Sequence, residues 1–71
     1  MKAPALKVEF SGGQPQSVNG VRVSHLIDAY RFWPNWWEGK APRDYFLLEV
    51  QVSTVEVYRS EGRWFFSRVL D

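Results

Sequence analysis

The sequence predicts an all-β domain, a small SH3-like or partly open β-barrel of about five antiparallel strands. Short runs in which apolar and polar residues alternate recur along the chain, as expected for strands buried on one face. Residues that favour turns separate these runs, and no stretch has the apolar spacing of a convincing helix. Because the chain has 71 residues, we expect a single domain over residues 1–71 with one core.

The first third of the chain predicts strands joined by tight turns. Residues 6–10 alternate apolar with charged side chains and should form a strand. A break rich in Gly and Pro follows over residues 11–15, and residues 16–18 form a short extended segment. Asn19-Gly20 is a two-residue hairpin signal, because both residue types accept a positive φ, so the next strand begins at Val21.

Residues 21–33 predict one strand with a bend inside it. The apolar side chains change parity between the start of this run, at Val21, and its end, at Phe32. We therefore expect a bulge or sharp bend near Ser24-His25, of the kind that lets one strand serve two sides of a small barrel. A helical turn over residues 23–30 is the alternative, which the β-branched residues at the start disfavour.

The remainder of the chain predicts a three-stranded antiparallel meander. The expected strands span residues 45–52, 54–59 and 63–70. Residues 60–62 form the tight turn before the last strand. Within that strand, we expect Trp64 and Phe66 to point into the core, because both lie on the apolar parity.

The composition makes packing of aromatic rings the main source of stability. The chain has four Trp, three Tyr and five Phe, and each large ring can bury about 150–250 Å². It has no cysteine, which excludes disulfide bonds, thiolate metal sites and a catalytic thiol.

The charge and hydropathy of the chain limit its partners. A net charge of +1 is far below that of proteins that hold nucleic acid by charge alone. Six of the nine basic residues are arginine, which favours planar, bidentate or stacked contacts. No run of 18 apolar residues is present and the N-terminus does not resemble a signal peptide, so we expect a cytoplasmic protein without a membrane partner.

No pattern in the sequence predicts catalysis, a metal site or a cofactor. Ser24, His25 and Asp28 are close in the chain, but neighbours on a strand point to opposite faces, so a catalytic triad is not expected. One histidine and scattered carboxylates offer no converging metal ligands. Gly12-Gly13 lacks the lysine and the helix of a phosphate-binding loop. We therefore expect a protein that is not an enzyme.

The strongest functional signal is a group of tryptophans and arginines around the turn that follows residue 32. The candidate partner-binding residues are Arg31, Trp33, Trp36, Trp37 and Arg43. Trp and Arg are the side chains that most often dominate interface energetics. Because Trp36 and Trp37 are adjacent, at least one of them should face solvent on an extended backbone. Alternatively, some of these rings close the core of this small domain.

Part of the chain resembles a family of small bacterial β-domains. The resemblance covers residues 21–71 and rests on Asp28, Tyr30, Arg31, Trp36, Trp37, Arg43, Asp44, Tyr45, Phe46, Glu49, Val57, Tyr58, Arg59, Gly62, Arg63, Trp64 and Phe65. Members of that family occur alone or near the end of ImuB-type proteins, which are catalytically inactive relatives of Y-family DNA polymerases in a mutagenic translesion cassette. The chain departs from the family at residue 30, where Trp is expected, and at residues 34–35 and 38, where the expected charges differ.

Two functional hypotheses follow. The resemblance implies a non-enzymatic accessory module of DNA damage tolerance, which binds a polymerase-related protein. The alternative is a module that binds single-stranded nucleic acid by stacking bases on Trp33, Trp36 and Trp37 and by contacts from arginine to phosphate. Self-association of the chain is a further way to cover these rings.

Overall fold

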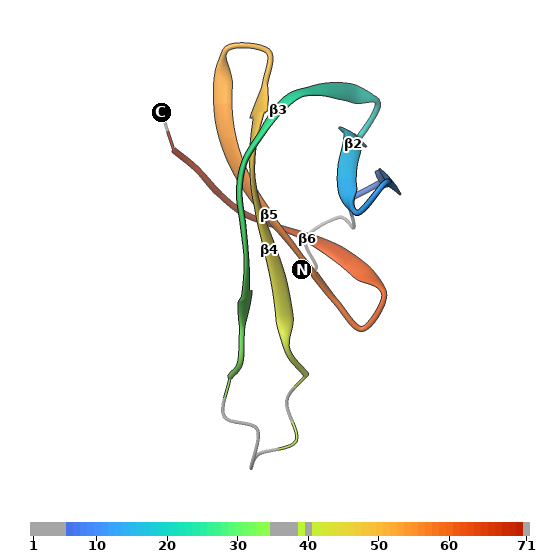
Figure 1. Ribbon diagram of the computed structural model, residues 1–71, viewed down its shortest axis with the longest axis vertical. Coiled ribbons are helices and arrows are strands. Elements are labelled where there is room, and N and C mark those ends of the chain that lie inside the picture. Colours follow the sequence, from blue (N-terminus) through green and yellow to red (C-terminus); the bar gives the residue numbers. More distant parts are fainter. Residues whose placement is uncertain (1–5, 35–38, 40, 71) are drawn as a thin grey trace, which may run out of the picture.

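The computed structural model describes residues 6–34, 39 and 41–70, and every element in this part of the chain is a β-strand. The six strands are β1 (Val8–Ser11), β2 (Gln14–Val18), β3 (Val21–Phe32), β4 (Arg43–Val50), β5 (Ser53–Ser60) and β6 (Arg63–Val69). Each strand pairs antiparallel with the next, in the order β1-β2-β3-β4-β5-β6 (Figure 1). The predicted all-β, partly open barrel is confirmed, as a curled half-barrel of six strands.

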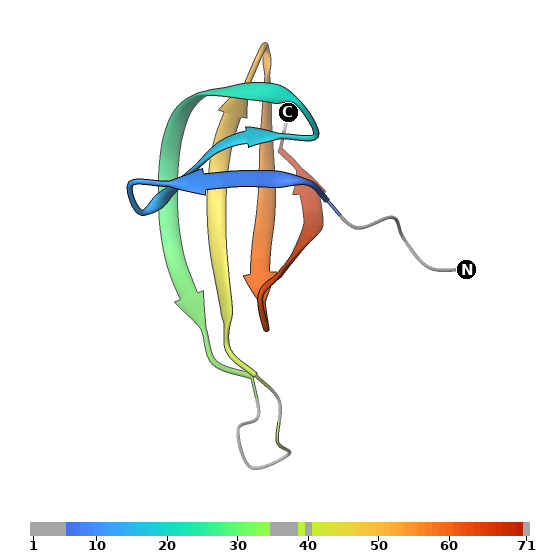
Figure 2. The same cartoon turned by 90° about the vertical axis from the view of Figure 1, so that its right-hand side faces the viewer.

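Strand β3 is bent and joins the β1–β2 hairpin to the sheet formed with β4, β5 and β6. Its first two residues, Val21 and Arg22, pair with β2, whereas the rest of the strand pairs with β4. The register against β4 shifts between Val23 and His25, where the sequence predicts a bend. The bend turns the β1–β2 hairpin over one face of the sheet (Figure 2). The alternative of a helical turn in this segment is wrong.

Tight two-residue turns join each pair of successive strands except β3 and β4. Asn19-Gly20 links β2 to β3 with φ values of 50° and 85°, and Glu61-Gly62 links β5 to β6 with φ values of 52° and 77°. Positive φ at both turn residues matches the right-handed twist of the flanking strands. Both turns lie where the sequence predicts them, so the predicted meander with its reversal at residues 60–62 is confirmed.

Several predicted strand ends are wrong by one or two residues, and two of these differences change where a residue lies. Strand β4 ends at Val50, so Val52 lies in the turn before β5 and is 98% exposed instead of belonging to a strand. Strand β2 begins at Gln14, within the predicted break, and includes a buried Pro15. Pro15 pairs with Phe10 next to a register irregularity, where a missing backbone N–H is tolerated.

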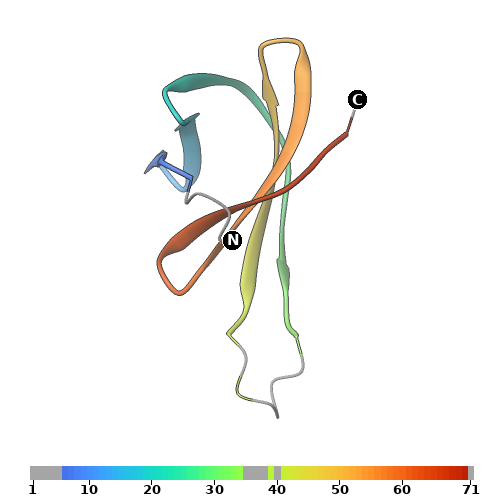
Figure 3. The same ribbon diagram turned by 180° about the vertical axis from the view of Figure 1, so that it is seen from behind.

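The core lies between the four-stranded β3–β6 sheet and the β1–β2 hairpin. Its buried side chains are Phe46, Leu48, Val57 and Trp64. We call the face that carries them the inner face, and the opposite face the outer face. Figures 1 and 3 show from opposite sides that β1 and β2 lie on one side of the sheet. The outer face therefore has no described element packed on it.

The half-barrel is barely closed between its first and last strands. Among the described residues, the backbone link across this gap is a 3.4 Å hydrogen bond from the Leu6 N–H to the Trp64 carbonyl. Trp64 is buried beside this link, as the sequence predicts. Phe66, which was also expected in the core, is 51% exposed, and that expectation is wrong. It lies on the inner side but at an edge strand, where no second sheet covers it.

Replacing Trp64 by alanine should prevent stable folding. The indole ring packs against Phe46, at a ring-centroid distance of 5.5 Å, and against Phe10, at 5.7 Å. Removing a buried Trp costs about 3–5 kcal/mol, which is most of the stability expected of so small a domain. Urea denaturation followed by far-UV circular dichroism measures the loss. Trp33→Ala is the matched control and should unfold like the parent, because Trp33 is 61% exposed. A cooperative transition of Trp64→Ala near that of the parent would contradict this assignment.

Candidate functional site

Four aromatic rings form a continuous row across the outer face of the sheet. Tyr30 on β3, Tyr45 on β4, Tyr58 on β5 and Phe65 on β6 lie directly opposite one another in the strand register. Each successive pair of ring centroids is 5.1 Å apart, with interplanar angles of 5°, 36° and 24°. We call these four rings the aromatic ladder.

The alternation of side chains along each strand explains why the ladder faces outward. Phe46 and Val57 point to the core, so their neighbours Tyr45 and Tyr58 point to the opposite face. Two rings lying side by side in one plane would overlap if their centroids were only 5.1 Å apart. The rings therefore stand face to face and turn their edges toward solvent. The two faces of the central rings are therefore occupied by their neighbours in the ladder.

Phe32 and Arg43 extend the ladder at its β3–β4 end. The ring of Phe32 meets that of Tyr45 edge to face, with centroids 6.4 Å apart. The Arg43 guanidinium lies 5.0 Å from the centroid of the Tyr58 ring, and its Nη1 donates a 3.4 Å hydrogen bond to the Tyr45 hydroxyl. This hydrogen bond raises the pKa of Arg43 above its usual value. The result is an amphipathic surface in which one cation lies over packed rings.

A buried carboxylate holds the outer face together beside the ladder. Glu56 is 4% exposed although it is charged. Its carboxylate accepts hydrogen bonds from the Tyr30 hydroxyl (2.7 Å), the Ser67 hydroxyl (2.9 Å) and Arg68 Nε (3.2 Å). Burial alone raises the pKa of Glu56, but these donors outweigh burial and hold it below the usual range. Glu56 thus connects β5 to both β3 and β6.

A second charged group lies on the inner side of the sheet. Asp44 accepts a 2.7 Å hydrogen bond from Arg31 Nε and lies 3.6 Å from Arg59 Nη2. The bond from Arg31 lowers the pKa of Asp44. The Arg59 guanidinium in turn covers the rings of Phe10, at 4.7 Å, and Trp64, at 5.6 Å. Both arginines are thus paired with Asp44, and Arg59 also caps the core.

The structure separates the residues that the sequence groups into one site. Arg31 lies 5.7 Å from the ring centroid of Trp33 and pairs with Asp44. Arg43 instead belongs to the ladder. Trp36 and Trp37 lie outside the described residues. Arg31 and Trp33 thus share a surface that does not include Arg43.

The sequence did not predict the ladder. Alternation along residues 45–52 and 54–59 does place Tyr45 and Tyr58 on the face opposite the core-facing residues. A comparison of strand registers could then have aligned both tyrosines with Tyr30 and Phe65.

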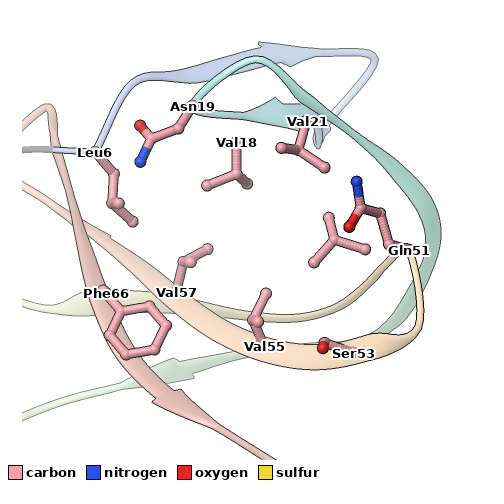
Figure 4. Close-up of a pocket in the computed structure, with 10 residues that line it drawn as sticks. Leu6, Val18, Asn19, Val21, Gln51, Ser53, Val55, Val57 and Phe66 are labelled. Atoms are coloured by element: carbon pink, nitrogen blue, oxygen red, sulfur yellow. The ribbon is translucent and has the colours of Figure 1, made fainter.

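The inner side also has an open cavity at one end of the half-barrel. Its volume is about 300 Å³. It is lined by Leu6, Val18, Asn19, Val21, Val50, Gln51, Ser53, Val55, Val57 and Phe66 (Figure 4). The lining carries no charged side chain, so the cavity suits an uncharged, mainly apolar group.

The described residues do not form a recognisable catalytic or metal centre. No group of three or more His, Asp or Glu side chains among them is placed to hold a metal ion. The carboxylate of Asp28 accepts a hydrogen bond from the Ala29 N–H at 2.8 Å, while Ser24 and His25 are exposed. In residues 6–34, 39 and 41–70 there is no helix with the length and apolarity needed to cross a bilayer.

Comparisons of the chain with protein families, characterised proteins and solved structures gave no match. The chemistry of the two faces is therefore the basis on which a function can be proposed.

Acid should destabilise the parent chain more than the Glu56→Gln variant. The folded-state pKa of Glu56 is depressed, so its stabilisation is complete above the unfolded-state pKa of about 4.3 and is lost as the pH falls through the folded-state pKa. Glutamine cannot titrate, so the variant should be about 1–3 kcal/mol less stable at pH 7 and less sensitive to acid. Urea midpoints between pH 7 and pH 3 measure both effects.

Glu49→Gln is the matched control for this experiment, because Glu49 is an exposed glutamate on the neighbouring strand. Its urea midpoint at pH 7 should equal that of the parent. Equal acid sensitivity of Glu56→Gln and the parent would show that the charge of Glu56 does not stabilise the fold.

Proposed function

We propose that this chain is a non-enzymatic protein-interaction module whose docking surface is the outer face that carries the aromatic ladder. The observation that carries the proposal is the row of in-register rings on a sheet face without any described element packed on it. Tyrosine, phenylalanine and arginine are enriched in protein interfaces, and this face combines all three.

The packing of the ladder favours tight binding at low entropic cost. Each ring is held by the ring beside it, and Glu56 fixes the Tyr30 hydroxyl. A partner that covers these side chains therefore immobilises few free rotamers. Tyrosine offers both apolar area and a hydroxyl that can hydrogen-bond, which suits a face that is exposed in the free protein and buried in a complex.

The same geometry favours a protein partner over single-stranded nucleic acid. A base stacks on the face of a ring, but the faces of Tyr45 and Tyr58 are already covered by neighbouring rings. Arg31 and Arg68 are paired with carboxylates, and the net charge is +1. The exposed ring of Trp33 beside Arg31 is the feature that supports the nucleic-acid alternative.

The resemblance to the small bacterial domains found alone or in ImuB-type proteins suggests the biological setting. We propose that the partner is a polymerase-related protein of a translesion-synthesis assembly in the cytoplasm. Among the residues that carry the resemblance, Tyr45 lies on β4, Tyr58 on β5 and Phe65 on β6. The resemblance thus includes the strands that present the ladder.

Tyr45→Thr should weaken binding to the inactive polymerase relative from the same genome by about tenfold or more, because it removes a central ring of the interface. Threonine keeps the strand propensity, and circular dichroism checks the fold. Calorimetric titration measures the affinity.

Arg43→Gln is a second variant that leaves all the rings in place and should also weaken binding. Loss of binding in Trp33→Thr, with Tyr45→Thr unaffected, would move the site to the loop after β3.

Oligo-dT should bind weakly or not at all. A stacked base quenches tryptophan emission, and phosphate contacts make the affinity fall steeply with salt. Fluorescence titration at two salt concentrations measures both effects. Tight, salt-sensitive binding that is lost in Trp33→Ala, Trp36→Ala or Trp37→Ala would make the chain a single-strand-binding module.

A further inference from the structure

Two arginines of the outer face lie on the same side of the aromatic ladder. Strands β4 and β6 run in the same direction, because each pairs antiparallel with β5. Arg43 comes two residues before Tyr45 on β4 and therefore shares its face. Arg63 comes two residues before Phe65 on β6 and is placed in the same way. We call this side of the ladder the cation side.

Neither arginine has a carboxylate partner within the described residues. The Arg43 guanidinium contacts the Tyr58 ring and the Tyr45 hydroxyl, and both of these groups are uncharged. Arg63 is exposed, and Glu61 in the adjoining turn forms no ion pair with it. The cation side thus presents two positive charges that no ion pair within the described residues compensates.

The opposite side of the ladder carries exposed carboxylates. Glu49 lies four residues after Tyr45 on β4, and Asp28 lies two residues before Tyr30 on β3, which runs the other way. The even spacing keeps both on the ladder's face, and both are exposed. The Asp28 carboxylate accepts the Ala29 N–H, a neutral donor, so its charge is not compensated. We call this side of the ladder the acid side.

The remaining charges on the acid side cancel. Glu56 and Arg68 form an ion pair at 3.2 Å, and His25 is counted as neutral. The acid side therefore has a formal charge of −2 from Asp28 and Glu49, and the cation side has +2 from its two arginines. The outer face is neutral as a whole and polarised across the ladder.

We propose that a second copy of the chain covers the outer face, related to the first by a twofold axis that runs in the interface along the ladder. This rotation turns the two outer faces toward each other. It places the cation side of each copy over the acid side of the other, and the contact occurs twice. The ring edges of the two ladders meet between these charged rows. The inference rests on the proposed docking role of the outer face but not on a polymerase-related partner.

The charge pattern selects both the occupant and its orientation. A twofold axis parallel to the strands would place arginines over arginines, and opposed like charges are costly. A partner of single-sign charge would be attracted by one side of the ladder and repelled by the other. A second copy carries the complementary pattern on both sides. The dimer and a polymerase-related partner then compete for one face, so the free chain hides its ladder at high concentration.

The test is sedimentation velocity of the full chain from micromolar to millimolar concentration. We expect a weak dimer that forms in the upper part of this range and weakens with added salt, because the charges are exposed. Amide shifts of the ¹⁵N-labelled chain should change with dilution on β4 and β5, at Tyr45 and Tyr58, and not on the β1–β2 hairpin.

Charge-reversed variants test the orientation. Arg63→Glu and Glu49→Lys should each weaken self-association about tenfold, because each change neutralises one side of the face and the lost contact occurs twice. An equimolar mixture of the two variants should associate more tightly than either alone, since the intact acid side of one meets the intact cation side of the other. Lys7→Glu is the matched control, because Lys7 precedes the hairpin that covers the inner face, and it should associate like the parent.

Three outcomes would overturn the proposal. They are a monomer at millimolar concentration, equal weakening in Arg63→Glu and Lys7→Glu, or a mixture that associates no better than its components. A monomer whose Tyr45→Thr variant still loses the polymerase-related partner would remove the dimer and keep the proposed function. A dimer with these charge effects, together with a partner that is indifferent to Tyr45→Thr, would do the reverse.

Discussion

The register of β4 against β5 is the constraint on which both faces of this protein depend. These strands pair without irregularity from Asp44↔Arg59 to Val50↔Ser53. The pairing puts Phe46 opposite Val57 on the inner face and Tyr45 opposite Tyr58 on the outer face. A slip of one residue would exchange the two sets of side chains and move tyrosines into the core. Burial of the inner set therefore fixes the position of the ladder.

The outer strands adjust to this pair through local irregularities. Strand β3 shifts register twice against β4, and β6 shifts once against β5. The shift in β6 lies between the residues that pair with Val57 and Glu56, so Ser67 and Arg68 can both reach the Glu56 carboxylate. A buried charge is costly unless it is well hydrogen-bonded, and Glu56 has three donors. The carboxylate thus favours one arrangement of the strands on a face that has no core of its own.

Aromatic rings are arranged differently on the two faces. On the inner face, Trp64 and Phe46 are packed against each other and buried, and Arg59 covers the Trp64 ring. On the outer face, rings of similar size are stacked in a row and keep their edges in contact with solvent. A chain without cysteine needs the first set to fold. The second set contributes less to folding than a buried core would, and this exposed apolar area supports the proposal that the outer face binds a partner.

The sequence by itself determined the strand class, the turns at Asn19-Gly20 and Glu61-Gly62, the bend in β3 and the burial of Trp64. Alternation and turn chemistry are local properties of the backbone, so they can be read from neighbouring residues. Only the tertiary structure aligned Tyr30 with Phe65, buried Glu56, exposed Phe66 and separated Arg43 from Arg31 and Trp33. These features depend on the register between strands and on the incomplete closure of the half-barrel. Both result from contacts between residues far apart in the chain, which the local pattern does not encode.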